Sequence, residues 1–317
     1  MRRFLRKSAL FLAPVAAYML AIMAVDPFDL FPVFAALGPP QGIKDTVASG
    51  NEDALYKFIR YRNRPAPNII LGDSRMYSLD SGAIRAASGE DYFNFAIQGA
   101  SFGEIADAFW FAAGRSELKH VFIGLNFLLF NESNRKDRTT GAKCIVRNPL
   151  LYFCNYPVLK ASLEVVESLG SGAIPLGRPR MDKEGFWRYV LYEETVPGYL
   201  HRYRYPQSFV AELERMTAYA KAHAIDLRFV IPPTHQDLQR RVEEMGFSAE
   251  VERFKAQLRE LAPTYDFEYA NALTADSANF KDPMHYNAKV GRGLVDEIWG
   301  QRPVYARFSR PSPPAPP

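Results

Sequence analysis

The sequence predicts an α/β fold in which a largely parallel sheet carries helices on both faces. Short apolar runs alternate with stretches of helical spacing from residue 68 to residue 125, and again from residue 208 to residue 270. Such alternation indicates βαβ units, because parallel strands need a crossover connection between them. The composition agrees with a globular chain of one large or two small domains: 317 residues, 48% hydrophobic and 23% charged.

Each element follows from its local pattern. The strand-like runs NIIL, YFNFAI, HVFIGL and LRFVI are short and apolar, and three of them end at Gly72, at Gln98-Gly99 and at Pro232-Pro233. The intervening segments repeat apolar residues every three or four positions, as helices do. In chain order, the prediction is a strand at 68–71, a helix at 75–87, a strand at 92–97, a helix at 101–115, a strand at 120–125, a helix at 208–223, a strand at 227–231, a helix at 248–261 and a short strand at 267–270.

Three segments fall outside this alternation. Residues 26–66 are rich in Pro, Gly and Asp and are predicted to be an ordered but irregular approach to a domain at 67–308. Residues 131–205 interrupt that domain and are long enough to form an inserted subdomain or lid. Residues 309–317 (SRPSPPAPP) are proline-rich and are predicted to be disordered.

The N-terminus combines charge and hydrophobicity. Four of the 39 basic residues lie in the first seven positions, and residues 9–25 contain no charge. We expect residues 1–7 to be cytoplasmic and residues 8–25 to be a transmembrane anchor, with the rest of the chain across the membrane. A cleaved signal peptide is the second interpretation and a buried helix the third. The remaining 35 basic residues equal the 35 acidic ones, which argues against a nucleic-acid partner.

Cys144 and Cys154 are the two cysteines, ten positions apart. In an oxidising compartment they could close a small disulfide loop, and otherwise they are two unpaired small apolar residues. Neither a cysteine nor a carboxylate lies at metal-ligand spacing from His120, His201 or His223, so we expect no metal site.

The first candidate for chemistry is Gly72-Asp73-Ser74-Arg75, directly after the first predicted strand. The ligands of parallel sheets bind beyond the carboxyl ends of the strands. Ser74 there could act as a nucleophile once a base removes its proton, although Asp73 or Ser74 could also simply cap the next helix.

The second candidate is Asp282-Pro283-Met284-His285, after the last predicted strand. A histidine that serves as a general base needs a carboxylate to hold its tautomer, and a separation of three residues in a turn can supply one. Oxyanion donors are available after two other strands: the backbone N–H of Gly99, together with that of Ser74, and the amide of Asn126.

These four blocks, Gly72-Asp73-Ser74, Gly99, Gly124-Leu125-Asn126 and Asp282 to His285, resemble those of the SGNH, or GDSL-like, hydrolase superfamily. Phe127 stands where that family has Asp after the third block. The resemblance covers roughly residues 68–292. It implies a flavodoxin-like α/β/α sandwich and acyl-ester chemistry at a serine, without metal or organic cofactor.

The anchor and the phrases GDSRM, NFAIQGAS and DPMHYN are similar, more narrowly, to the membrane-anchored accessory proteins of polysaccharide and teichoic-acid O-acylation. That resemblance implies periplasmic or extracellular O-acyl transfer to a polysaccharide, with a multi-span membrane acyltransferase as the acyl donor. An esterase that releases the acyl group to water would use the same residues. A non-catalytic protein that binds the polymer or the acyltransferase is the alternative from another class.

Two further residues are candidate substrate contacts. Arg75 follows the serine and could meet an anionic group or pair with an acid. His235 follows the strand at 227–231 and is either a substrate contact or, more simply, a solvated loop histidine.

Overall fold

The computed structural model of the protein describes residues 1–32, 38–171 and 182–311. The chain divides into two compact units. We call residues 65–137 and 179–317 the sheet body, and residues 1–64 and 138–178 the helical body.

The sheet body contains a six-stranded sheet in the order β2-β1-β3-β4-β5-β8. Its first five strands run parallel, and β8 pairs antiparallel with β5. The mostly parallel sheet predicted from the sequence is therefore present. The strands are β1 (Asn68–Leu71), β2 (Phe93–Asn94), β3 (His120–Gly124), β4 (Asp226–Ile231), β5 (Thr264–Asp266) and β8 (Arg307–Ser309).

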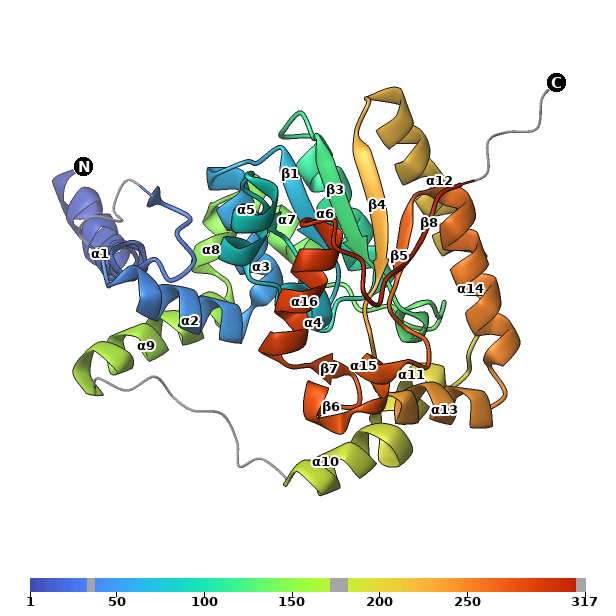
Figure 1. The fold of residues 1–317 in the computed structure, drawn as a ribbon. Coiled ribbons are helices and arrows are strands. Elements are labelled where there is room, and N and C mark those ends of the chain that lie inside the picture. Colours follow the sequence, from blue (N-terminus) through green and yellow to red (C-terminus); the bar gives the residue numbers. More distant parts are fainter. Residues whose placement is uncertain (33–37, 172–181, 312–317) are drawn as a thin grey trace. The chain divides into compact units, whose positions relative to one another are not determined.

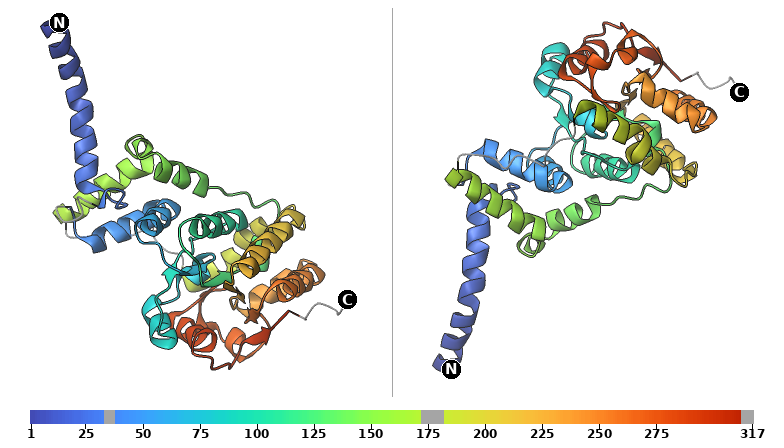
Figure 2. Two further views of the ribbon diagram at one scale, coloured as in Figure 1. Left: turned by 90° about the horizontal axis from the view of Figure 1, so that it is seen from above. Right: turned by 90° about the horizontal axis from the view of Figure 1, so that it is seen from below.

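Helices cover both faces of this sheet. On one face, Ile70, Phe122 and Val230 share a buried core with α5 (Ser81–Ser88) and α16 (Ala288–Ile298). On the other face, α6 (Phe102–Ala113) contacts β1, and α12 (Gln207–Ala222) contacts β4, α6 and α14 (Ser248–Leu261). The views along the strands show α6 and α12, in green and gold, on one side and α5 and α16, in cyan and red, on the other (Figure 2). The sheet body is thus an α/β/α sandwich.

Short elements gather at the carboxyl ends of the parallel strands, at the lower edge of the sheet in Figure 1. This edge, which we call the rim, is where a parallel sheet places its ligands. The hairpin of β6 and β7 contacts α4 and α10, and α11 contacts η2. The rim elements are α4 (Ser74–Tyr77), η2 (Phe127–Leu129), α10 (Lys183–Arg188), the π-helical turn η3 (Tyr189–Glu193), α11 (Thr195–Leu200), α13 (Gln236–Glu244), α15 (Ala272–Ala275), η4 (Ser277–Asn279), β6 (Phe280–Asp282) and β7 (His285–Tyr286).

The helical body shows that the expectation of an irregular segment at 26–66 is wrong for much of its length. Helices α2 and α3 occupy it, and they pack on each other, on α9 and on α7. Their apolar residues, such as Val47, Leu55 and Phe58, are buried, so tertiary packing stabilises these helices, and the prolines of the segment lie outside them. The helices of this body are α1 (Arg2–Val25), α2 (Gln41–Asn51), α3 (Asp53–Asn63), α7 (Thr139–Arg147), α8 (Leu150–Phe153) and α9 (Tyr156–Ser171).

The predicted insertion at 131–205 is divided between the two bodies. Residues 138–178 belong to the helical body, whereas both ends of the insertion, 131–137 and 179–205, belong to the sheet body. Cys144 and Cys154 are exposed free cysteines, so the disulfide considered above is not formed in this structure. No helix among the described residues has both the length and the hydropathy needed to cross a membrane.

Three predicted boundaries in the sheet body are also corrected. The helix expected at 75–87 is two helices, because the Asp80 carboxylate accepts the Ala83 N–H and starts α5 afresh. The last parallel strand is 264–266 rather than 267–270, since the Glu268 N–H turns back to the Asp266 carboxylate. Ser309 ends strand β8 and pairs with Thr264 instead of opening a disordered tail, and residues 312–317 lie outside the described residues.

Candidate active site

The structure brings Ser74, His285 and Asp282 together at the rim, although 211 positions separate the serine from the histidine. Ser74 Oγ lies 2.7 Å from His285 Nε2. On the other side of the ring, His285 Nδ1 lies 2.8 Å from one carboxylate oxygen of Asp282 and 2.9 Å from the other. The carboxylate fixes the proton on Nδ1, which leaves Nε2 as the acceptor for the serine hydroxyl. Such a relay can activate the serine as a nucleophile.

The Asp282 to His285 segment forms a tight turn that holds its own geometry. One Asp282 oxygen also accepts the backbone N–H groups of Met284, at 2.8 Å, and His285, at 3.0 Å. Asp282 and His285 are paired across the β6–β7 hairpin. The Asp282 side chain is 10% exposed and that of His285 is 35% exposed. The carboxylate is therefore fixed in a sheltered place while the imidazole reaches toward solvent.

Two glycines position the turn that carries Ser74. A Cβ built on Gly124 would lie 2.0 Å from the Cγ atom of Met76, and one built on Gly72 would lie 2.6 Å from the same atom. Met76 is buried and stands two positions after the serine. Gly72 also has φ +145°, which side-chain-bearing residues rarely adopt. The glycines at the ends of β1 and β3 thus let Met76 enter the core and draw the start of α4 against the sheet.

Arg75 pairs with an acid rather than facing the solvent. Its Nη2 lies 2.7 Å from Asp73 Oδ2, and both side chains are almost completely buried. Burial alone would raise the pKa of the Asp73 carboxyl, but the Arg75 guanidinium and its hydrogen bonds hold that pKa below its ordinary value. Of the two possibilities left open by the sequence, the ion pair is the one formed.

Asn126 lies against the same carboxylate. Its Nδ2 donates to Asp73 Oδ2 at 3.1 Å, while its Oδ1 accepts the Leu129 N–H. A primary amide carries two protons on its nitrogen, so Asn126 can serve Asp73 and still offer a second proton at the rim. Asp73 therefore connects Arg75, Asn126 and the turn of Ser74.

Gly99 follows an extension of the pairing between β1 and β2. The Ile97 N–H donates to the Gly72 carbonyl at 3.0 Å, so the next residues run beside Asp73 and Ser74. Gly99 has φ +60° and is half-buried, with no atom within 4 Å of a built Cβ. The structure thus places the loop of Gly99 along the turn of Ser74, where backbone N–H groups from both can face one oxygen.

His235 is buried, and the solvated loop histidine expected from the sequence is wrong. It is 4% exposed and packs edge-on against Trp187 and Phe280. Its ring Nδ1 accepts the Asp237 N–H, and its backbone N–H donates to the Pro283 carbonyl at 2.9 Å. His235 therefore supports the turn of Asp282 and His285 through its contacts with Pro283 and Phe280.

Two residues of the site escaped the sequence analysis. The Tyr286 hydroxyl donates to the Arg75 carbonyl, and this bond connects the two segments that supply the relay. Glu268 is buried near Arg75, and burial raises the pKa of its carboxyl above the ordinary value against the influence of Lys255. Tyr286 lies within the phrase DPMHYN and Glu268 in no motif, and the role of each depends on a tertiary contact that the local sequence does not show.

Comparisons with known proteins add little. No family model matches the sequence, and no curated protein does. Among solved structures, the chain is similar to a Bacteroides fragilis protein described as a "putative acylhydrolase", with 11% identity and a TM-score of 0.40, over 77% of this chain and 93% of that one. We draw nothing from a likeness this distant. Within the described residues, no three His, Cys, Asp or Glu side chains are grouped to hold a metal ion.

Proposed function

We propose that the protein is a serine acyl-ester enzyme of the SGNH type that transfers an acyl group to a polysaccharide through an acyl-serine. The observation that carries the proposal is the continuous relay of Ser74, His285 and Asp282, with hydrogen-bond distances of 2.7 and 2.8 Å. Three residue types in this order and geometry are what nucleophilic attack on an ester needs.

In the first half of the reaction, Ser74 Oγ attacks the carbonyl carbon of an acyl ester while His285 Nε2 takes the serine proton. Asp282 stabilises the imidazolium that forms. The N–H groups of Ser74 and Gly99, with the amide of Asn126, face the oxyanion of the tetrahedral intermediate. The carbon–oxygen bond to the leaving alcohol then breaks, His285 returns the proton to that alcohol, and an acyl-serine remains.

In the second half, a hydroxyl group attacks the acyl-serine by the reverse of these steps, with His285 again taking and returning the proton. A sugar hydroxyl gives transfer, and water gives hydrolysis. An SGNH esterase or deacetylase is therefore the alternative that uses the same residues. A non-catalytic role in polymer binding or assembly is the alternative that uses none of their chemistry.

The proposed location follows from the N-terminal segment. We place the sheet body outside the cytoplasm, held at the inner membrane through residues 8–25 and beside a multi-span acyltransferase that supplies the acyl group. The basic residues before this segment and its lack of charge support this orientation, as do apolar side chains on α1 that are more than half exposed, among them Leu10, Phe11 and Leu20. Removal of residues 1–25 should release the protein from carbonate-washed membranes, and retention would contradict the attachment.

Fluorophosphonate labelling of the full chain in detergent tests the chemistry. A single adduct on Ser74, found by mass spectrometry and lost in Ser74→Ala and His285→Ala, is the expected result. Ser208→Ala and His223→Ala serve as matched controls, because both residues are exposed on the sheet body. Equal labelling of wild type and His285→Ala would contradict the relay. Full polymer modification in cells by Ser74→Ala would replace catalysis with the assembly role.

A further inference from the structure

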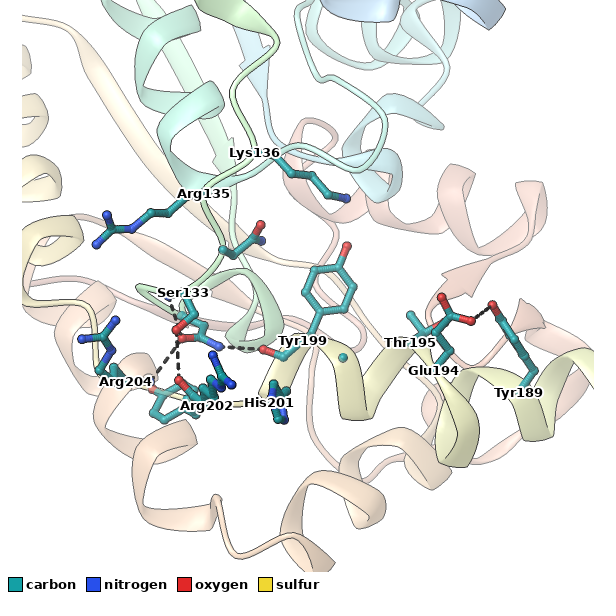
Figure 3. Close-up of a pocket in the computed structure, with 14 residues that line it drawn as sticks. Ser133, Arg135, Lys136, Tyr189, Glu194, Thr195, Tyr199, His201, Arg202 and Arg204 are labelled. Carbon is teal, nitrogen blue, oxygen red and sulfur yellow. Dashed lines mark hydrogen bonds between the residues drawn. The ribbon is translucent and has the colours of Figure 1, made fainter.

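A cavity of about 920 Å³ lies in the sheet body, between the two ends of the segment at 131–205. One wall is the chain that follows η2, including Arg135 and Lys136, and the other runs from η3 through α11 to Arg204. Figure 3 shows side chains from both walls around the space, with the ring of Tyr199 between them. A cavity of this size is large enough for several sugar units or for another ligand of similar volume.

The lining of the cavity is strongly basic. Arg135, Lys136, Arg202 and Arg204 are exposed, and none of the four forms an ion pair within the described part of the chain. The imidazole of His201 lies among them. Cations with no acidic partner attract an anionic ligand, most strongly at low ionic strength.

Little negative charge offsets these cations. Glu194 is the one carboxylate among the described lining residues, and it accepts the hydroxyl hydrogen bond of Tyr189 (Figure 3). Beyond the four basic residues at the N-terminus, the whole chain balances its remaining 35 basic residues against 35 acidic ones. The positive charge of the cavity is thus a local concentration and does not reflect the average surface.

Asn131 holds the two walls together. It is 1% exposed; its Nδ2 donates to the Tyr199 carbonyl at 2.7 Å, and its Oδ1 accepts the Arg204 N–H at 3.2 Å. Ser133 Oγ donates to the Arg202 carbonyl at 3.0 Å. The backbones that carry the cations are therefore fixed in advance, which lowers the entropic cost of binding a ligand.

The walls of the cavity are linked to segments of the candidate active site. Ser101, two positions after Gly99, donates its hydroxyl to the Lys136 carbonyl at 2.7 Å. Tyr199 acts electrostatically on the buried Arg75 guanidinium and raises its pKa, and Arg75 is the neighbour of Ser74. One wall thus connects to the loop of Gly99, and the other contributes to the electrostatics of the turn that carries Ser74.

We infer that this cavity binds the acceptor of the acyl group, and that the acceptor is an anionic glycan with carboxylate or phosphate groups along its chain. Arginine forks and the lysine ammonium bind those groups, while tyrosines offer flat faces and hydroxyl groups to sugar rings. A glycan also supplies the hydroxyl groups that the second half-reaction needs. The role as acceptor rests on the proposed function, whereas the binding of the polymer does not.

Affinity electrophoresis of full-chain Ser74→Ala tests the binding without catalysis. The probes are polygalacturonate for carboxylates, a phosphomannan for phosphates, and dextran as the neutral glycan. We expect retardation by at least one anionic glycan and none by dextran. Arg202→Ala combined with Arg204→Ala should weaken binding about tenfold or more, a change of about 1.4 kcal/mol. The matched control, Arg215→Ala with Lys221→Ala, removes two exposed cations from α12 and should leave binding unchanged.

Each outcome of this experiment supports or contradicts the proposed glycan site. Retardation by polygalacturonate alone identifies a carboxylate glycan, and retardation by phosphomannan alone identifies a phosphate glycan. Equal loss in the pocket and control variants, equal binding of dextran, or equally tight binding of duplex DNA would overturn the inference. If Ser74 is labelled and no glycan binds, the acyl-ester proposal is supported and the proposal of an anionic acceptor is contradicted. Binding without labelling supports the inferred site and favours the assembly role.

Discussion

The fit of Met76 between two glycines gives the sharpest test of how the fold positions Ser74. In Gly124→Ala, the new methyl would lie 2.0 Å from Met76 Cγ and 2.7 Å from its sulfur. Favourable contacts between such atoms lie at about 3.5–4.0 Å, so the overlap is about 1.5 Å. Because Met76 is 1% exposed, it cannot swing into solvent, and the start of α4 must shift.

The expected cost has two parts. Overpacking a buried site of this kind destabilises a protein by about 1–3 kcal/mol. A displacement of about 1 Å in a nucleophile lowers its reactivity about 100-fold. We therefore expect a matching loss in the free energy of unfolding, measured in urea, and slower fluorophosphonate labelling of Ser74 than the loss of folded protein explains.

A double-mutant cycle separates this mechanism from a general defect. Met76→Ala alone should cost about 2–5 kcal/mol, and the space it creates accepts the new methyl. The double variant should therefore be no less stable than Met76→Ala. Gly72→Ala should resist this rescue, because its φ of +145° and the Gly124 carbonyl at 3.1 Å remain. Gly293→Ala, in open space on α16, should change stability by no more than about 1 kcal/mol. Additive costs in the Gly124–Met76 cycle would refute the reasoning.

Four other predictions follow from the same geometry. Asp73→Asn should destabilise the protein by about 3–5 kcal/mol near pH 7, because it leaves the buried Arg75 without its partner. Folding lowers the pKa of Asp73, so the ionised carboxylate stabilises the fold fully above the pKa of the unfolded state. This stabilisation is lost as pH falls through the pKa of the folded state. A difference in the free energy of unfolding between wild type and variant that persists at low pH in urea titrations would contradict this. Tyr286→Phe removes the bond to the Arg75 carbonyl and should cost about 1 kcal/mol with slower Ser74 labelling, whereas unchanged values would show that the contact is unimportant. Asp282→Asn should slow Ser74 labelling by about 10⁴-fold, as expected when the histidine loses its tautomer control; a mild effect measured by intact mass would remove Asp282 from the relay. Ellman's reagent should count two reactive thiols, Cys144 and Cys154, in the native protein, since both are exposed. A lack of reaction before reduction would indicate a disulfide.

Much of the sheet body could be predicted because its signals are local. The parallel strands at 68–71, 120–124 and 226–231 coincide to within one residue at either end with apolar runs that end at glycine or proline or at a polar residue. The turn of Asp282 and His285 was also predictable, since its hydrogen bonds span three residues. The break at Asp80 and the end of β5 were missed, because a side-chain cap and a carboxylate turn override the apolar spacing there.

The sequence by itself determined the alternating architecture and the residue types that acyl-ester chemistry requires, since these depend on periodicity and on motifs of three or four residues. Only the tertiary structure decided the surroundings of those residues: the Asp73–Arg75 pair is buried, His235 lies in the core, and residues 131–137 lie near residues 199–204 around a basic cavity. The physical reason is that burial and charge pairing depend on which distant segments the fold brings within a few ångströms. No local pattern encodes that distance.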